Sequence, residues 1–169
     1  AKDYADRVKH DDATEYLRFY YASKLSGGAA DLDFNVDEFI NKVNTTLCNN
    51  IGNFQNRTST FLDRFFESTV PDCDWDADIA QEVAKVVDEI QKAHEVVNYR
   101  LVTDKIHYLG SVANKYFQDT KPWELVKTDM DKAAEVMNTC ANLIRVLGSL
   151  LKPIVPTIAA RLEKQFGEE

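Results

Sequence analysis

The sequence has few of the residues that interrupt helices, with only 6 glycines and 4 prolines among its 169 residues. Folds built from many short strands need frequent turns, and these two residues are common in turns. No alternating apolar and polar pattern of useful length is present either. We therefore expect long helices. The 44% hydrophobic and 28% charged content is that of a globular protein.

The three cysteines, Cys48, Cys73 and Cys140, are odd in number and widely separated. The sequence contains no Cys-x-x-Cys pair and no cluster of cysteine with histidine. These absences argue against both a zinc module and a disulfide framework. We expect free, mostly buried thiols in a reducing cytoplasm.

Long apolar runs are also missing. The most apolar tract, residues 143–160, is interrupted by Arg145, Lys152 and two prolines, which excludes a membrane span. The N-terminus lacks a basic segment followed by an apolar run, so no signal peptide is indicated. We expect a soluble, cytoplasmic protein with no membrane partner.

Positive charge is scarce, and the formal net charge is −8. Binding to nucleic-acid phosphates usually requires a basic surface. The charge therefore argues against non-specific binding to DNA or RNA over the whole surface. It leaves room for one local recognition site.

Apolar residues at helical spacing predict an all-α bundle of about five or six helices. Asn35 with Glu38 forms a capping signal that opens the longest helix, which we expect to continue to about Glu67. The other expected helices cover residues 13–25, about 78–97, about 99–121, 128–151 and a terminal stretch after residue 156. Pro122 ends one of these helices, and Thr128 with Asp131 is expected to cap the next.

A file of polar residues, Asn49, Asn53 and Arg57, follows the long helix at four-residue spacing. In a regular α-helix each step rotates by about 40°, so the three side chains form one stripe, roughly 110° from the centre of the apolar sector. Such a stripe lies on the shoulder of a bundle, where a neighbouring element can form one wall of a shallow cleft. A solvated helix edge is the alternative interpretation, and the adjacent Asn50 and Asn56 favour it.

The second notable motif is Lys121-Pro122-Trp123. A tryptophan directly after a helix-ending proline can stand clear of the core, although tryptophan is also well buried on average and can pack down onto it. An exposed Trp123 beside Asn53 and Arg57 would combine a stacking platform with hydrogen-bonding groups. Those are the two requirements for reading an unpaired RNA base.

The chain resembles the C-terminal part of methionyl-tRNA synthetase, a class I aminoacyl-tRNA synthetase. The resemblance covers nearly the full length and rests on residues 15–25, 31–35, 49–57, 113–116, 121–123 and 147–156. Class I relatives for isoleucine, valine, leucine and cysteine share the helical bundle and some of these pieces. The combination of an asparagine, an arginine four residues later and a distant Pro-Trp is similar to the methionine enzyme.

The resemblance implies that this bundle binds the CAU anticodon of methionine tRNAs. By the same resemblance Asn53 and Arg57 match the pair that reads the anticodon, and Trp123 matches the aromatic residue that stacks on it. Asn49, one turn earlier, would add a supporting contact.

Lys121 and Lys127 are candidate phosphate contacts.

The family's HIGH-type and KMSKS motifs, which bind ATP, are absent, and so is its zinc-binding cysteine module. Residues 1–33 resemble the end of the stem-contact region that follows the KMSKS loop, and residues 34–169 resemble the anticodon-binding bundle. The resemblance thus implies a domain of an ATP-dependent methionine–tRNA ligase. Its partners are tRNA and the catalytic domain of the parent. ATP, and zinc if the parent holds it, would bind in the missing parts.

Two other interpretations remain open at this stage. A helical protein-interaction domain that has lost tRNA recognition would agree with the acidic charge. A self-contained enzyme would need a nucleophile with its base or a metal centre. His10, His94 and His107 lie far apart in the sequence and fit surface or packing positions better, so we assign no catalytic residue and no metal ligand.

Overall fold

The computed structural model describes residues 12–28 and 32–166, in which the chain forms helices and connecting turns and no strand. The elements are α2 (Ala13–Ala22), α3 (Val36–Val43), the π-helix η1 (Asn44–Gly52), α4 (Asn53–Phe65), α5 (Ala77–Glu95), α6 (Tyr99–Thr120), α7 (Pro122–Thr128), α8 (Met130–Leu151) and α9 (Pro156–Gln165). The predicted all-α bundle is confirmed.

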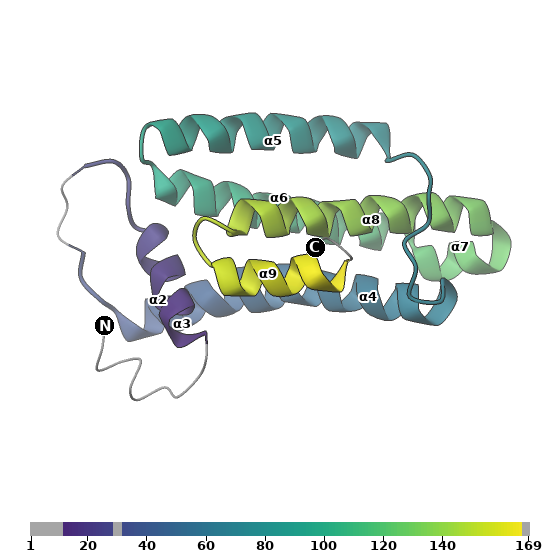
Figure 1. Ribbon diagram of the computed structural model, residues 1–169, viewed down its shortest axis with the longest axis horizontal. Coiled ribbons are helices and arrows are strands. Elements are labelled where there is room, and N and C mark those ends of the chain that lie inside the picture. Colours follow the sequence, from purple (N-terminus) through teal and green to yellow (C-terminus); the bar gives the residue numbers. More distant parts are fainter. Residues whose placement is uncertain (1–11, 29–31, 167–169) are drawn as a thin grey trace.

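The long helices lie along the main axis of the molecule, with α2 and α3 towards one end and α7 at the other (Figure 1). Helix α8 packs against α4, α6, α7 and α9, while α6 also packs against α5 and η1. In the described part of the chain no helix is long and apolar enough to cross a membrane.

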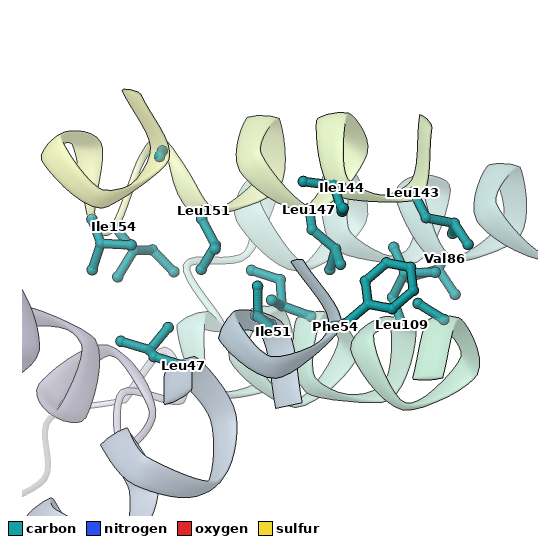
Figure 2. Close-up of a cluster of buried hydrophobic side chains, with 14 of the residues drawn as sticks. Leu47, Ile51, Phe54, Val86, Leu109, Leu143, Ile144, Leu147, Leu151 and Ile154 are labelled. Atoms are coloured by element: carbon teal, nitrogen blue, oxygen red, sulfur yellow. The ribbon is translucent and has the colours of Figure 1, made fainter. Parts of the chain in front are cut away.

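The core is one cluster of buried apolar side chains to which nearly every helix contributes. Figure 2 shows its central part, where Leu47 and Ile51 of η1 and Phe54 of α4 point toward side chains of α5, α6 and α8. Phe54 is fully buried. The junction between η1 and α4 is therefore held against the middle of the bundle.

Of the two predicted capping residues, one is confirmed and one is wrong. Asn35 accepts a hydrogen bond from the backbone N–H of Glu38 at 3.0 Å, as predicted. The prediction that Thr128 caps α8 is wrong, because Asp129 occupies the cap position and its Oδ1 accepts from the N–H of Lys132 at 3.0 Å. A carboxylate one residue later satisfies the same group of free N–H donors.

The expectation of one regular α-helix from Asn35 to about Glu67 is wrong in its middle and at its end. The right-handed helix is continuous from α3 to α4 and ends at Phe65, but residues 44–52 are π-helical. Each π-helical hydrogen bond spans five residues instead of four, so this segment turns less per residue than an α-helix. A helical wheel with a constant α-period therefore misplaces the side chains on either side of η1 relative to one another.

Helix α9 receives its N-terminal cap from a distant helix. Its own cap residue, Val155, offers no side-chain acceptor. Instead the buried carboxylate of Glu15 in α2 accepts from the N–H of Thr157 at 2.7 Å and from the N–H of Ile158 at 3.0 Å. A carboxylate is favoured at this position by the helix dipole as well as by the hydrogen bonds.

We expect the substitution Glu15→Ala to lower the free energy of unfolding by about 2–3 kcal/mol, since it removes a buried carboxylate that accepts from two N–H groups at the start of α9. Urea denaturation monitored by circular dichroism measures the change. Thr14→Ala, on the exposed side of the same helix, is the matched control and should change the free energy by less than about 0.5 kcal/mol. Equal effects of the two substitutions would contradict this role of Glu15.

Candidate functional site

The predicted polar file lies across the boundary between η1 and α4. Asn49 belongs to the end of η1, Asn53 begins α4, and Arg57 follows one turn later. Both asparagines are exposed, and Arg57 is half-buried. Among the described residues no hydrogen bond to either asparagine side chain is found. Their amide groups therefore face solvent with donors and acceptors available.

Arg57 is held against an aromatic ring of a neighbouring helix. Its Cζ lies 4.4 Å from the ring centroid of Phe117 in α6, and its Nη2 donates to Oε1 of Gln118 at 3.3 Å. The cation–π contact and the hydrogen bond together restrict the guanidinium group. The remaining N–H groups of Arg57 stay available for a ligand, because a guanidinium carries five donors.

Trp123, in the first turn of α7, contacts the same phenylalanine. Its ring centroid lies 6.1 Å from that of Phe117. The ring is half-buried and packs against the edge of the core. The outcome lies between the two sequence interpretations, since the ring is neither clear of the core nor enclosed by it.

The turn between α6 and α7 differs in detail from the expectation that Pro122 simply ends a helix. Helix α6 ends at Thr120, and Lys121 adopts a left-handed conformation with φ of 48°. Pro122 is the first residue of α7 rather than a simple stop, a position that its fixed φ suits. The turn directs α7, and with it Trp123, back toward the ring of Phe117.

The phenylalanine at position 117 joins the two predicted motifs. Phe117 is buried and also meets Phe54 and Phe61 of α4, with ring centroids 6.5 Å and 6.1 Å away. Helix α6 thus lies beside α4, as a shared cleft requires. The sequence analysis assigned neither Phe117 nor Gln118 to the site. Their place in the last turn before Lys121-Pro122 was the available indication.

Asn50 is not part of a solvated edge, which corrects the interpretation given above. Only 8% of its surface is exposed. Its Nδ2 lies 2.8 Å from the backbone oxygen of His107 and 3.1 Å from Oγ of Ser111. Asn114 of α6 in turn donates to Oδ1 of Asn50 at 3.0 Å. We call the following residues the asparagine bridge: Asn50, His107, Ser111 and Asn114, together with Gly110, against which the side chain of Asn50 packs.

The histidines have structural surroundings where the structure describes them. His107 Nδ1 lies 3.2 Å from Asn50 Nδ2 and 3.3 Å from Thr46 Oγ1. An amide nitrogen only donates, so Nδ1 of His107 acts as acceptor in this arrangement. His94 lies edge-on against Tyr99, with ring centroids 5.5 Å apart. His10 lies outside the described residues.

The cysteines are free, but they are less buried than expected. Cys140 is buried, Cys73 is half-buried and Cys48 is exposed on η1. Burial raises the pKa of the Cys140 thiol well above its ordinary value.

The two lysines proposed for phosphate contacts differ. Lys121 forms an ion pair with Glu124, with an N–O distance of 3.5 Å. Lys127 is exposed, and in the described part of the chain no carboxylate pairs with it. Of the two lysines, only Lys127 therefore offers an uncompensated positive charge.

Comparison with known families identifies the class of protein. Residues 1–59 match the model of class I tRNA synthetases (M), and residues 69–169 match the model described as the anticodon binding domain of methionyl tRNA ligase. The fold and the match define a helical domain of a class I tRNA synthetase. The chain belongs to the family of anticodon-binding domains of methionyl-tRNA ligase.

Relatives and solved structures give the same result. The chain is 35% identical over 152 residues to a methionine–tRNA ligase of Thiobacillus denitrificans and 31% identical over 150 residues to one of Methanopyrus kandleri. In both cases 89% of this chain and 22% of the relative are covered. The fold matches a structure of Mycobacterium tuberculosis methionyl-tRNA synthetase in complex with methionyl-adenylate, with a TM-score of 0.80, 19% identity and coverage of 89% and 31%.

The chain therefore spans about a fifth of the length of these curated relatives. The two matched ranges are separated by residues 60–68, which neither family model covers. The division at residue 33 stays a prediction, and residues 1–11 and 29–31 of the predicted stem-contact segment lie outside the described residues.

The asparagine bridge predicts a pH dependence of stability. Burial lowers the pKa of His107 from its ordinary value of 6.5, and the charge of Lys42 acts in the same direction while Asp104 opposes it. The unfolded chain therefore takes up this proton at higher pH than the folded chain. The stabilisation is complete above pH 6.5 and decreases as the pH falls towards the lowered pKa.

We expect His107→Gln to remove this part of the pH dependence, because glutamine does not titrate. Urea unfolding of both proteins between pH 7.5 and pH 5 measures it. The carboxylates contribute equally to both curves, so the difference between the curves isolates His107. Parallel curves for the two proteins would contradict the assignment.

Proposed function

We propose that this chain recognises the CAU anticodon of methionine tRNA within a methionine–tRNA ligase. The observation that supports the proposal is that Arg57 and Trp123 both contact Phe117, while Asn53, one helical turn before Arg57, is exposed. The membership of the anticodon-binding family supplies the ligand class.

The residue chemistry suits an unpaired cytosine. Its edge offers one donor and two acceptors, so a reader must both give and accept hydrogen bonds. The amide of Asn53 does both, and the guanidinium of Arg57 donates only. The ring of Trp123 offers a stacking surface that contributes roughly 1–3 kcal/mol per base. Asn49 is then a supporting contact one turn away.

The charge around the site favours base contacts over phosphate contacts. With Lys121 paired to Glu124 and the chain at −8 overall, few cations can release counterions from a nucleic-acid backbone. Lys127 is the remaining candidate of the two for a phosphate contact. Affinity in this arrangement depends on stacking and on hydrogen bonds to base edges.

The proposal extends to the longer protein. Its relatives are methionine–tRNA ligases of which this chain matches 22%, so methionine activation with ATP, and a zinc module if the protein has one, belong to the part that the chain does not span. The catalytic domain and the tRNA are then its partners in the cytoplasm. The chain itself contributes recognition and no catalytic group.

Binding of the 169-residue chain to a short anticodon stem-loop tests the proposal. We expect a CAU loop to bind more tightly than a loop whose first anticodon base is changed to G. Trp123→Ala should weaken CAU binding about tenfold or more, because a stacking contact of this kind is worth roughly 1–3 kcal/mol. Fluorescence anisotropy of a labelled loop measures both effects.

Tyr108→Ala is the matched control, because Tyr108 is an exposed aromatic residue outside the proposed site. It should leave the affinity unchanged. If the chain binds both loops equally or neither of them, the proposal fails. A helical protein-interaction domain without tRNA recognition would then be the better interpretation.

A second prediction concerns the longer ligase. We expect Trp123→Ala there to reduce charging of methionine tRNA far more than methionine-dependent exchange of pyrophosphate into ATP, because activation does not involve the anticodon. Steady-state kinetics of both steps on the same preparation give the two losses. Equal losses, or no loss in either step, would refute the role of Trp123.

A further inference from the structure

The direction of Asn53 and Arg57 depends on the π-helical segment that precedes them. The helix is anchored on both sides of η1. Before it, Lys42 Nζ bonds Asp104 Oδ1 at 3.0 Å, and after it Phe54 is buried beside Phe117. If η1 wound into an α-helix, it would turn further per residue. Asn53 and Arg57 would then rotate about the helix axis relative to α3.

Two close approaches mark η1 as a tightly fitted segment. A Cβ at Gly52 would lie 3.0 Å from the backbone oxygen of Leu47, five residues earlier. A Cβ at Gly110 of α6 would lie 2.8 Å from Oδ1 of Asn50. Both positions therefore favour glycine, although glycine inside a helix costs about 0.5–1 kcal/mol relative to alanine. The space at Gly110 admits the side chain of Asn50 between the two helices.

The asparagine bridge fills that space with hydrogen bonds. Asn114 Nδ2 lies 3.0 Å from Oδ1 and 3.0 Å from the backbone oxygen of Asn50, and 2.9 Å from the backbone oxygen of Gly110. The amide of Asn50 donates in return to the backbone oxygen of His107. A residue of η1 is thus tied, through side chain and backbone alike, to one turn of α6.

We propose that Asn50 and Asn114 are positioning residues that hold η1 in its π-helical form and so set the orientation of Asn53 and Arg57 beside Trp123. Neither residue needs to touch the RNA. This inference rests on the proposed function, because it explains how the side chains of that same site are held in the orientation that binding requires.

The same helix carries both the bridge and the aromatic platform. Gly110, Asn114 and Phe117 are spaced by four and three residues, which places them on one face of α6. The bridge fixes η1 at one point of that face, and Phe117 receives Arg57 at the next. A change at the bridge therefore alters which part of α4 faces Phe117.

The test compares two glycine substitutions in the 169-residue chain. Gly110→Ala adds a methyl group against Asn50 and removes no hydrogen-bonding group. Gly148→Ala is the matched control, since it too is a buried helical glycine, but its added Cβ would lie at an ordinary 3.5 Å from Cβ of Leu162. We expect Gly110→Ala to weaken binding of the CAU stem-loop about tenfold and to reduce its preference over the loop with a changed first base. Gly148→Ala should change neither quantity.

A second variant, Asn114→Ala, adds no atoms and should give the same loss of affinity for the CAU stem-loop. If only one of the two variants folds, its result alone decides the test. Glu15→Ala controls for general destabilisation, because it removes hydrogen bonds between α2 and α9 that involve no residue of the proposed site, and it should leave loop binding unchanged. Amide hydrogen exchange supplies an independent readout. In Gly110→Ala and Asn114→Ala we expect exchange within residues 44–52 to accelerate more than in the rest of the chain, and we expect no such local excess in the two controls.

The outcomes separate the two proposals. If the unchanged chain binds the CAU loop selectively and Gly110→Ala and Asn114→Ala bind it equally well, the positioning role is refuted while the proposed function stands. Equal losses in the bridge variants and in Glu15→Ala would also refute it, because the effect would then be general destabilisation. If the unchanged chain binds no loop, the proposed function fails, and this inference fails with it.

Discussion

The packing of η1 and α4 against α6 is the contact on which the rest of the site depends. Helix α6 presents Gly110, Asn114 and Phe117 on one face, over a rise of about 10 Å. The first two accommodate a buried asparagine, and the third contacts both a guanidinium group and a tryptophan ring. Because one rigid helix supplies both kinds of contact, the polar bridge and the recognition groups keep a fixed separation. The left-handed residue Lys121 ends that helix, and α7 then carries Trp123 back toward the platform.

The charge of the chain gives this packing its importance. A basic protein can hold RNA loosely through its phosphates and then sample orientations of its recognition groups. Here the net charge is −8 and Lys121 is paired with Glu124. Little long-range attraction is available to compensate for misplaced side chains. Hydrogen bonds and stacking act only over short distances, so the side chains must already be placed when the base arrives.

The sequence predicts the fold class well, because helix periodicity and capping are local properties. Asn35 caps its helix as predicted. The π-helical segment escaped prediction because a helical wheel assumes one period throughout. A signal was present, since Phe39, Val43, Leu47 and Ile51 recur every four residues, a longer spacing than the α-period. The burial of Asn50 could not be read locally, because it depends on a glycine sixty residues away that leaves room for its side chain. For the same reason the contacts of Phe117 with Arg57 and Trp123 could not be predicted from the sequence.

The asparagines near η1 show how one residue type performs two tasks in the same stretch of helix. Asparagine is a poor helix former, so each one weakens the regular α-helix locally. On the exposed side, Asn49 and Asn53 lower the local helix stability but present amides that both donate and accept hydrogen bonds. On the buried side Asn50 offsets it with bonds to α6 that an aliphatic residue cannot form. Stronger helix formers in this segment would favour regular α-geometry, and that geometry would turn the exposed amides away from the position that α6 defines. In this segment helix propensity therefore favours regular α-geometry, whereas the orientation of the site requires the π-helical form. The hydrogen bonds of the asparagine bridge stabilise the π-helical form.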